Sequence, residues 1–378
     1  MKITFPHIGD AHIIGRLFFQ EIGIDIISPP SNTIKGLEEG SSHSPDEICL
    51  PFKLMVSNLM EAHRLGADTV VMPATMGPCR LGEYGELLKS IFDKKGYAFD
   101  WIILDASKAI GSKELLRRLS RIIEDSDKSI LHILIALHGT YKIIKRFELL
   151  EKKARILCGY EINKGDCKKT VALCRKEIKV ASSIKKALHI ITEHIRMLSY
   201  IAIDKEKHPL KLLLTGEIYS LIDSFGNHHL EELLMDMGVS FEKRITLGWW
   251  IDNTLLNPLT IRQIARKKNS YLPLSIGGYA KETVEEGILC NHKNYDGIVQ
   301  IFPVGCMPEI VAKAVFSKMS KELNIKVLTI IFDEMAGEAG YITRIEAFVD
   351  LLNRRKKRSV KNGTMKRHGG KTNVLFGN

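Results

Sequence analysis

Two cysteines stand in similar surroundings in different halves of this chain. One lies in DTVVMPATMGPCRLGEY (68–84) and the other in DGIVQIFPVGCMPE (296–309). In each segment an aspartate leads into an apolar run typical of a buried strand, a proline ends the run, and a glycine-containing loop brings Cys79 or Cys306 to a predicted helix start. Backbone N–H groups at a helix start favour a thiolate. Both cysteines are placed as a metal ligand or nucleophile would be, although many free cysteines only pack in a core.

The other five cysteines fall into three groups. Cys49 lies in SSHSPDEICLPFK (41–53), at or just before a predicted helix that runs to about residue 65. Cys290 precedes the second of the two strands and is a candidate metal ligand in addition to Cys49, Cys79 and Cys306. The remaining three lie in helical patterns at spacings that fit no common zinc site, and we interpret them as packing residues: Cys158, Cys167 and Cys174. An odd, uneven set of this kind does not indicate a disulfide framework.

The patterns around these cysteines predict an α/β protein with two Rossmann- or flavodoxin-like parallel-sheet domains and a helical insert between them. Alternating strand and helix patterns indicate a first domain over 1–112 and a second over 207–352. Between them, residues 113–206 are mainly helical, with one strand expected at 130–137. The last part, 353–378, is predicted to be a basic disordered tail.

Two acidic residues lie where a ligand would bind in such a fold. Glu217 follows a predicted strand at its carboxyl end, where open parallel sheets bind their ligands. Glu309 lies in the first turn of the helix that follows Cys306. Each is a candidate catalytic acid or, alternatively, a helix or turn former. The pair Gly277-Gly278 could cradle a phosphate, but without a complete phosphate-binding motif an ordinary turn is favoured.

Composition limits the function classes. The chain has 378 residues, 45% of them hydrophobic, which suits two or three domains. It has no run of eighteen apolar residues and no signal-peptide pattern, so we expect a cytoplasmic protein with no membrane contact. The net charge is +11, but 353–378 holds nine Lys or Arg and no acid, while the rest has 46 basic and 44 acidic residues. Nucleic-acid binding is therefore expected only through the tail, if the tail is not a passive extension.

Five motifs in order resemble the activase-related proteins of the 2-hydroxyacyl-CoA dehydratase superfamily. They extend over most of the chain up to about residue 352, and they read SPDEICLPFK (44–53), GPCRLGEY (77–84), GEIY (216–219), CMPEIV (306–311) and DExxGEAGxxTRIEAF (333–348). The sequence departs from the family at Tyr279, where related sequences tend to have histidine. It also lacks an actin-like ATPase segment, so it is not expected to hydrolyse ATP.

The resemblance implies an iron–sulfur cluster. Dehydratase subunits of that superfamily hold a [4Fe–4S] cluster between α/β domains by three cysteines, and related proteins hold a double-cubane cluster. It thus implies Cys49, Cys79 and Cys306 as ligands, and thiolates are the soft ligands that such clusters require. The implied function is low-potential electron transfer or radical dehydration of a small, acyl-CoA-type substrate, as a lyase, a low-potential reductase or an electron carrier. The implied partners are an ATP-dependent activase as electron donor and a second subunit in a homo- or heterodimer.

Two other functions remain open from the sequence. A zinc protein could use the same three cysteines with His7, His43 or His292, although zinc sites usually contain closely spaced pairs of ligands. A non-catalytic binding or regulatory module could have the same fold, with its basic tail docking to nucleic acid.

Overall fold

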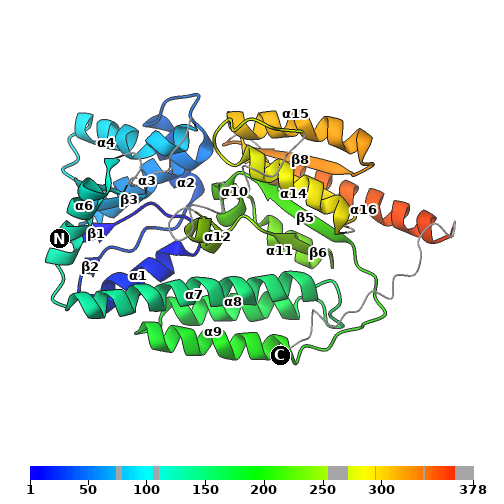
Figure 1. The fold of residues 1–378 in the computed structure, drawn as a ribbon, viewed down its shortest axis with the longest axis horizontal. Coiled ribbons are helices and arrows are strands. Elements are labelled where there is room, and N and C mark those ends of the chain that lie inside the picture. Colours follow the sequence, from blue (N-terminus) through cyan, green and yellow to red (C-terminus); the bar gives the residue numbers. More distant parts are fainter. Residues whose placement is uncertain (74–78, 105–109, 254–270, 294, 335–336, 362–378) are drawn as a thin grey trace. The chain divides into compact units, whose positions relative to one another are not determined.

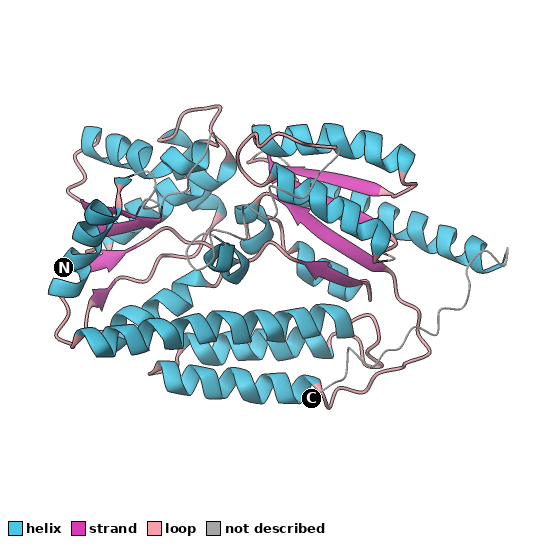
Figure 2. Cartoon of the chain, viewed as in Figure 1, coloured by secondary structure: helices cyan, strands magenta, loops and turns pink. Residues whose placement is uncertain are grey.

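The computed structural model describes residues 1–73, 79–104, 110–253, 271–293, 295–334 and 337–361. The chain separates into two compact units, Met1–Ala336 and Gly337–Asn378. The first unit contains two parallel four-stranded sheets and a helical region that lies between them in sequence (Figures 1 and 2). The predicted α/β fold class is therefore confirmed.

The first sheet has the strand order β2-β1-β3-β4, and all its pairs are parallel. Its central strand β3 is buried because Val70, Val71 and Met72 form a continuous apolar run between covering helices. The elements of this half are β1 (Lys2–Thr4), α1 (Ala11–Glu21), β2 (Asp25–Ile26), α2 (Ile34–Ser42), α3 (Leu50–Arg64), β3 (Thr69–Pro73), the 3₁₀ helix η1 (Arg80–Glu83), α4 (Tyr84–Lys94) and β4 (Asp100–Leu104).

The second sheet repeats this order as β6-β5-β7-β8, again all parallel. The edge strand β6 was not predicted; it is four residues long and carries Glu242 and Lys243, so its apolar pattern is weak. The elements are β5 (Lys211–Gly216), α10 (Ile218–Ile222), α11 (Leu230–Asp236), β6 (Ser240–Lys243), α12 (Leu247–Ile251), α14 (Ala280–His292), β7 (Gly297–Pro303), α15 (Met307–Glu322) and β8 (Val327–Phe332).

The two halves repeat each other in detail. Asp68, just before β3, accepts a hydrogen bond at 2.7 Å from the backbone N–H of Lys2, the first residue of β1. Asp296, just before β7, accepts one at 2.8 Å from the backbone N–H of Lys211, the first residue of β5. The aspartates that open the two similar sequence segments therefore have the same task, which is to join the starts of the two central strands of a sheet.

The helical region corrects one sequence prediction. It consists of α6 (Ser112–Glu124), α7 (Ile130–Leu157), α8 (Asp166–Lys179) and α9 (Ile184–Leu198). The strand expected at 130–137 is instead the beginning of α7, which Ser129 caps by accepting a hydrogen bond from the backbone N–H of His132. Helices α7, α8 and α9 lie side by side, and α7 contacts both α1 and β6 (Figure 1). One 28-residue helix thus packs against elements of both halves.

The second compact unit also differs from the prediction. Its helix α16 (Glu338–Lys361) continues across the expected boundary at residue 352 and includes the first nine residues of the segment predicted to be disordered. Lys and Arg are good helix formers, so the basic composition does not end the helix. The rest of that segment, 362–378, lies outside the described residues. Among the helices that the structure describes, none is long and apolar enough to cross a membrane.

Candidate functional site

All three predicted ligand cysteines are helix N-cap residues. Cys49 precedes α3, Cys79 precedes η1 and Cys306 precedes α15, each with an extended backbone conformation. None of the three side chains makes the capping hydrogen bond that a Ser, Thr or Asp would make at this position. The thiols therefore begin helices without being used to cap them.

Arg80 ties together the three segments that carry these cysteines. It directly follows Cys79. Its Nη1 donates a hydrogen bond at 3.0 Å to the carbonyl of Glu47, two residues before Cys49. Its Nη2 donates one at 2.8 Å to the carbonyl of Gly305, the residue before Cys306. Three segments that are far apart in the sequence are thus held together by one guanidinium group.

The paired glycines form a turn beside these cysteines. Gly278 has a φ of +54°, and a Cβ built on it would lie 2.8 Å from Pro308 Cγ and 3.8 Å from the Cβ of Cys79. The next residue, Tyr279, is the N-cap of α14. Since α14 precedes β7 as α3 precedes β3, Tyr279 occupies in the second half the place of Cys49 in the first. The repeat therefore brings three cysteines, and not four, to this region.

Burial governs the protonation of the three thiols. It raises the pKa of Cys49, of Cys79 and of Cys306, and the carboxylate of Glu217 raises each pKa further. A hydrogen bond between Cys49 Sγ and the Tyr84 hydroxyl acts in the opposite direction. The expectation that helix starts make these thiols acidic is wrong for the protein by itself, because loss of hydration outweighs the backbone N–H groups.

Glu217 lies within electrostatic reach of all three thiols and is also a helix cap. Its carboxylate accepts hydrogen bonds at 2.8 Å from the backbone N–H groups of Tyr219 and Ser220, which begin α10. It accepts a third, at 2.9 Å, from the Ser220 hydroxyl. Burial raises the pKa of Glu217 above its ordinary value, although these three donors oppose part of the rise. The alternative that Glu217 is a helix former is thus correct, although its carboxylate also raises the pKa of the three thiols.

Glu309 is a buried acid in the first turn of α15. Only 1% of it is exposed. Its carboxyl group accepts hydrogen bonds at 2.9 Å from Thr283 Oγ1 and at 2.9 Å from Gln300 Nε2. Burial raises its pKa to about 8, although the bonds from Gln300 and Thr283 lower it. Glu309 therefore carries a proton at neutral pH.

The sequence analysis missed Lys53, which lies one turn after Cys49 in α3. Lys53 is 3% exposed, and its ammonium group donates hydrogen bonds at 2.5 Å to Glu334 Oε1 and at 3.2 Å to the carbonyl of Asp46. Burial raises the pKa of Glu334, but Lys53 outweighs burial and lowers it. A lysine inside an otherwise buried helix was the signal available in the sequence.

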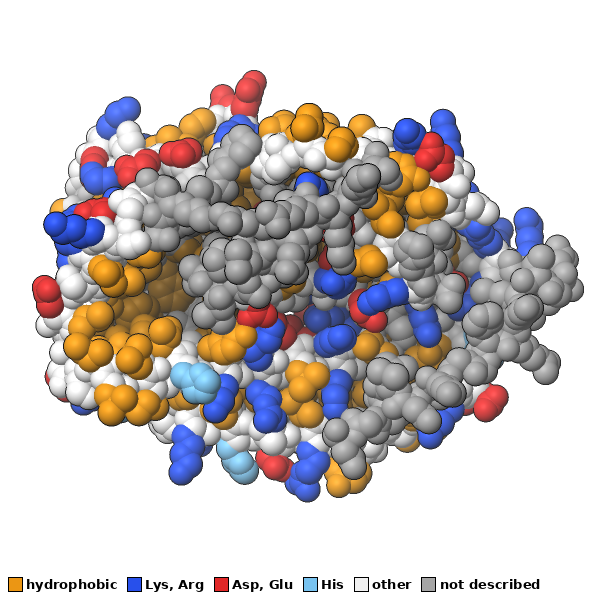
Figure 3. All heavy atoms as spheres, viewed as in Figure 1, with side chains coloured by type: hydrophobic (Ala, Val, Ile, Leu, Met, Phe, Trp, Pro, Cys, Tyr) orange, Lys and Arg blue, Asp and Glu red, His pale blue; other side chains and the backbone are white. Residues whose placement is uncertain are grey.

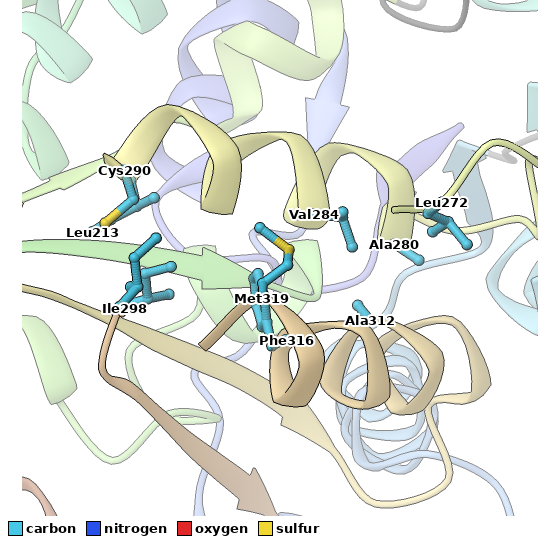
Figure 4. Close-up of a cluster of buried hydrophobic side chains, with 10 residues drawn as sticks. Leu213, Leu272, Ala280, Val284, Cys290, Ile298, Ala312, Phe316 and Met319 are labelled. Carbon is cyan, nitrogen blue, oxygen red and sulfur yellow. The ribbon is translucent and has the colours of Figure 1, made fainter. Parts of the chain in front are cut away.

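Cys290, the candidate fourth ligand, lies away from this site in an apolar core. It is fully buried on α14 among the side chains of β5, β7 and α15, including Leu213, Ile298 and Met319 (Figure 4). The three cysteines interpreted as packing residues are also buried in the helical region: Cys158, Cys167 and Cys174. Their surroundings fit a packing role.

Of the histidines proposed for zinc, His7 and His43 lie in the described part of the chain and form no metal-binding group with the cysteines there. His7 stacks on His12 with ring centroids 4.5 Å apart, and its Nε2 lies 3.8 Å from Asp223 Oδ2. Within the described ranges, no three His, Cys, Asp or Glu side chains are grouped to hold a single metal ion. The side chain of His292 is outside the described part.

His7 lies in a cavity of about 450 Å³ that is separate from the three cysteines. The cavity lies beyond the carboxyl ends of edge and central strands of both sheets and is closed by α7 and α8. Part of its charge is paired, as Arg175 is with Asp10 at 2.8 Å and with Glu151 at 3.1 Å. Lys179 and the buried carboxylate of Asp223, which lies 3.8 Å from His7 Nε2, also line the cavity.

These features define the class of protein as an α/β protein with two Rossmann-like parallel sheets. The candidate site is built from three N-cap cysteines, the half-buried Glu217 and the buried Glu309, and it draws on the carboxyl ends of β3, β5 and β7. No family model matches this chain. No curated protein matches it either.

Proposed function

We propose that Cys49, Cys79 and Cys306 hold an iron–sulfur cluster, and that the protein acts in low-potential electron transfer or radical dehydration. The observation that carries the proposal is the bridge made by Arg80, which brings the three cysteine segments together. Thiolates are the ligands that iron–sulfur clusters prefer.

The donor set fits a cluster better than a single ion. In a cluster each thiolate binds a different iron, so the thiolates stand farther apart than the ligands of one ion, and no single-ion group is found among the described residues. A cationic metal centre offsets the burial that keeps the thiols protonated, because a coordinating thiol is deprotonated by the metal. The hydroxyl of Tyr84 would remain hydrogen-bonded to Cys49 Sγ and orient this sulfur when it binds iron.

Three cysteine ligands leave one iron of a [4Fe–4S] cluster open, and a double-cubane cluster is the alternative form. Such a group supplies single electrons at low potential when bound. The protonated carboxyl of Glu309 would hold a proton beside the site, while the carboxyl group of Glu217 is already engaged by the N–H groups of Tyr219 and Ser220. Glu309 is therefore the better candidate for a catalytic acid.

The substrate and partners follow from the resemblance to the 2-hydroxyacyl-CoA dehydratase superfamily. We propose a small substrate of the acyl-CoA type, an ATP-dependent activase as electron donor, a dimeric assembly and a cytoplasmic location. The resemblance leaves a lyase, a reductase and an electron carrier as the possible activities. Turnover assays with and without a CoA thioester would separate these activities once the cluster is established.

The test is anaerobic purification with iron and sulfide analysis and visible and electron paramagnetic resonance spectra. Wild type should contain iron and sulfide with broad visible absorption. Replacing Cys49, Cys79 or Cys306 with serine should lower the iron content and bleach that absorption, since oxygen is a harder ligand. Wild type without iron, or full iron occupancy in the triple serine variant, would refute the proposal.

Cys290 and Cys174 provide matched controls. Both are fully buried in apolar surroundings, so alanine is a better replacement than serine, which would bury a hydroxyl group. Cys290→Ala and Cys174→Ala should retain iron. Loss of iron in Cys290→Ala alone, with the fold intact by circular dichroism, would indicate a fourth ligand and favour simple electron transfer.

The second candidate is a binding or regulatory module with this fold and no cluster. The observation that favours it is the raised pKa of all three thiols, which are protonated in the protein by itself. An iron-free, folded wild type would support it. Salt-sensitive RNA binding that is lost on deleting 362–378 would then assign the tail as its contact.

A further inference from the structure

The beginning of α7 exposes an apolar stripe that the core does not explain. Five large side chains within two and a half turns are between 54% and 68% exposed: Ile130, Leu131, Leu134, Ile135 and Leu137. Apolar side chains gather over this part of α7 on the face seen in Figure 3. The other face of the helix is already buried through Ile133, Ala136 and Ile143. The helix therefore has a second apolar face that the described chain leaves more than half exposed.

The stripe is also free of charge. From Ser129 to Tyr141 the sequence contains no Asp, Glu, Lys or Arg. This is the same run that resembles a buried strand in the sequence. Exposed apolar patches of this kind mark interaction surfaces in folded proteins. Because the stripe offers no charge, its partner must present an apolar, uncharged face.

Charged residues border the stripe with opposite signs at its two ends. Just before α7 lie three exposed acidic residues, Glu124, Asp125 and Asp127, and one exposed base, Lys128, which pairs with Asp127, so this border is negative overall. Just after the stripe, the exposed residues Lys142 and Arg146 are basic. Nine residues of helix from 130 to 138 span only about 13 Å, so both borders lie close to the stripe.

We propose that the stripe is a dimer interface in which α7 pairs with α7 of a second copy in antiparallel orientation. Such a two-fold pairing is self-complementary. It places Leu134 near the axis and packs two identical uncharged faces together. It also sets the acidic border of each copy opposite the basic border of the other, since residue 142 faces the turn around residue 126. A parallel pairing would instead place like charges together.

The first experiment measures mass by sedimentation over a range of concentrations. Wild type should be a dimer. The Leu134→Glu variant should raise the dimer dissociation constant by about tenfold or more, because it buries a charge at the centre of the interface. Val180→Glu is the matched control, since Val180 is 79% exposed at the end of α8 and outside the stripe. It should remain a dimer, and both variants should keep wild-type circular dichroism.

The second experiment tests the orientation. Lys142→Glu should weaken the dimer, and adding Asp127→Lys should restore it, because the pair exchanges the signs of the two borders. A monomeric wild type, or a Leu134→Glu variant that dimerises like wild type, would overturn the proposal. A monomeric wild type that binds phosphatidylcholine vesicles through the stripe would assign the surface to lipid and likewise overturn it.

Discussion

Replacing Glu231 with glutamine should remove a large part of the stability that the protein gains as the pH rises from about 2 to about 5. Glu231 lies at the start of α11 and joins three elements. Its carboxylate pairs with Lys243 of β6 and, at 3.0 Å, with Nη1 of Arg155 in α7. The side chain of Arg155 is only 2% exposed, so this pair is shielded from solvent and connects α7 to the second sheet.

The shift in the pKa of Glu231 gives the size of its contribution to the free energy of unfolding. Burial by itself would raise this pKa, but Lys243 and Arg155 outweigh burial and lower it from 4.5 to about 2. Each pH unit of difference between the folded and unfolded pKa is worth about 1.4 kcal/mol, so the ionised form contributes about 3 kcal/mol to the free energy of unfolding. Because the folded pKa is the lower one, this contribution is complete above pH 4.5 and is lost as the pH falls towards 2.

Urea unfolding of wild type and Glu231→Gln at several pH values between 2 and 7 measures this contribution. At pH 7 the variant should be less stable by about 3 kcal/mol, and the difference should shrink steadily below pH 4.5. Glu193→Gln is the control, because Glu193 forms an exposed pair with Arg196 that is worth less than about 1 kcal/mol. A difference between wild type and Glu231→Gln that stays constant with pH would refute the electrostatic explanation.

Two further substitutions test how the candidate site is held. Arg80→Ala removes both hydrogen bonds that link the cysteine segments. It should lower the free energy of unfolding by about 1–2 kcal/mol and reduce iron retention. Arg80→Lys should recover only part of the lost stability and iron, because an ammonium group cannot reproduce the two parallel donors of a guanidinium group. Equal iron retention in all three proteins would contradict the bridging role. Gly216→Ala should lower the free energy of unfolding by more than about 3 kcal/mol, since the new Cβ would lie 1.9 Å from the carbonyl oxygen of Ile301. Gly238→Ala is the control: its new Cβ would have no atom within 4 Å, so the loss should be about 1 kcal/mol. Similar melting temperatures for the two glycine variants would disprove this packing argument.

Apolar and helical patterns in the sequence predicted most of the helices and strands and the places of the site residues in them. The apolar runs before Pro73 and Pro303 predicted the central strands β3 and β7. The helical patterns after Cys49 and Cys306 predicted α3 and α15. These predictions held because burial of a strand between helices requires a continuous apolar run, and a helix requires a repeat near 3.6 residues.

Other features depend on packing between parts of the chain that are distant in sequence. The apolar run 130–137 suits a buried strand and an apolar helix equally well, and it is helical because it continues into one long amphipathic helix capped at Ser129. The protonation of Cys79 and Cys306 likewise depends on burial by residues far away in sequence. The bridge from Arg80 to the carbonyls of Glu47 and Gly305 has no sequence pattern at all, because any residue can supply a backbone carbonyl. Contacts of this kind depend on which loops the folded sheets bring together. The sequence around each loop does not indicate which other loop will lie next to it.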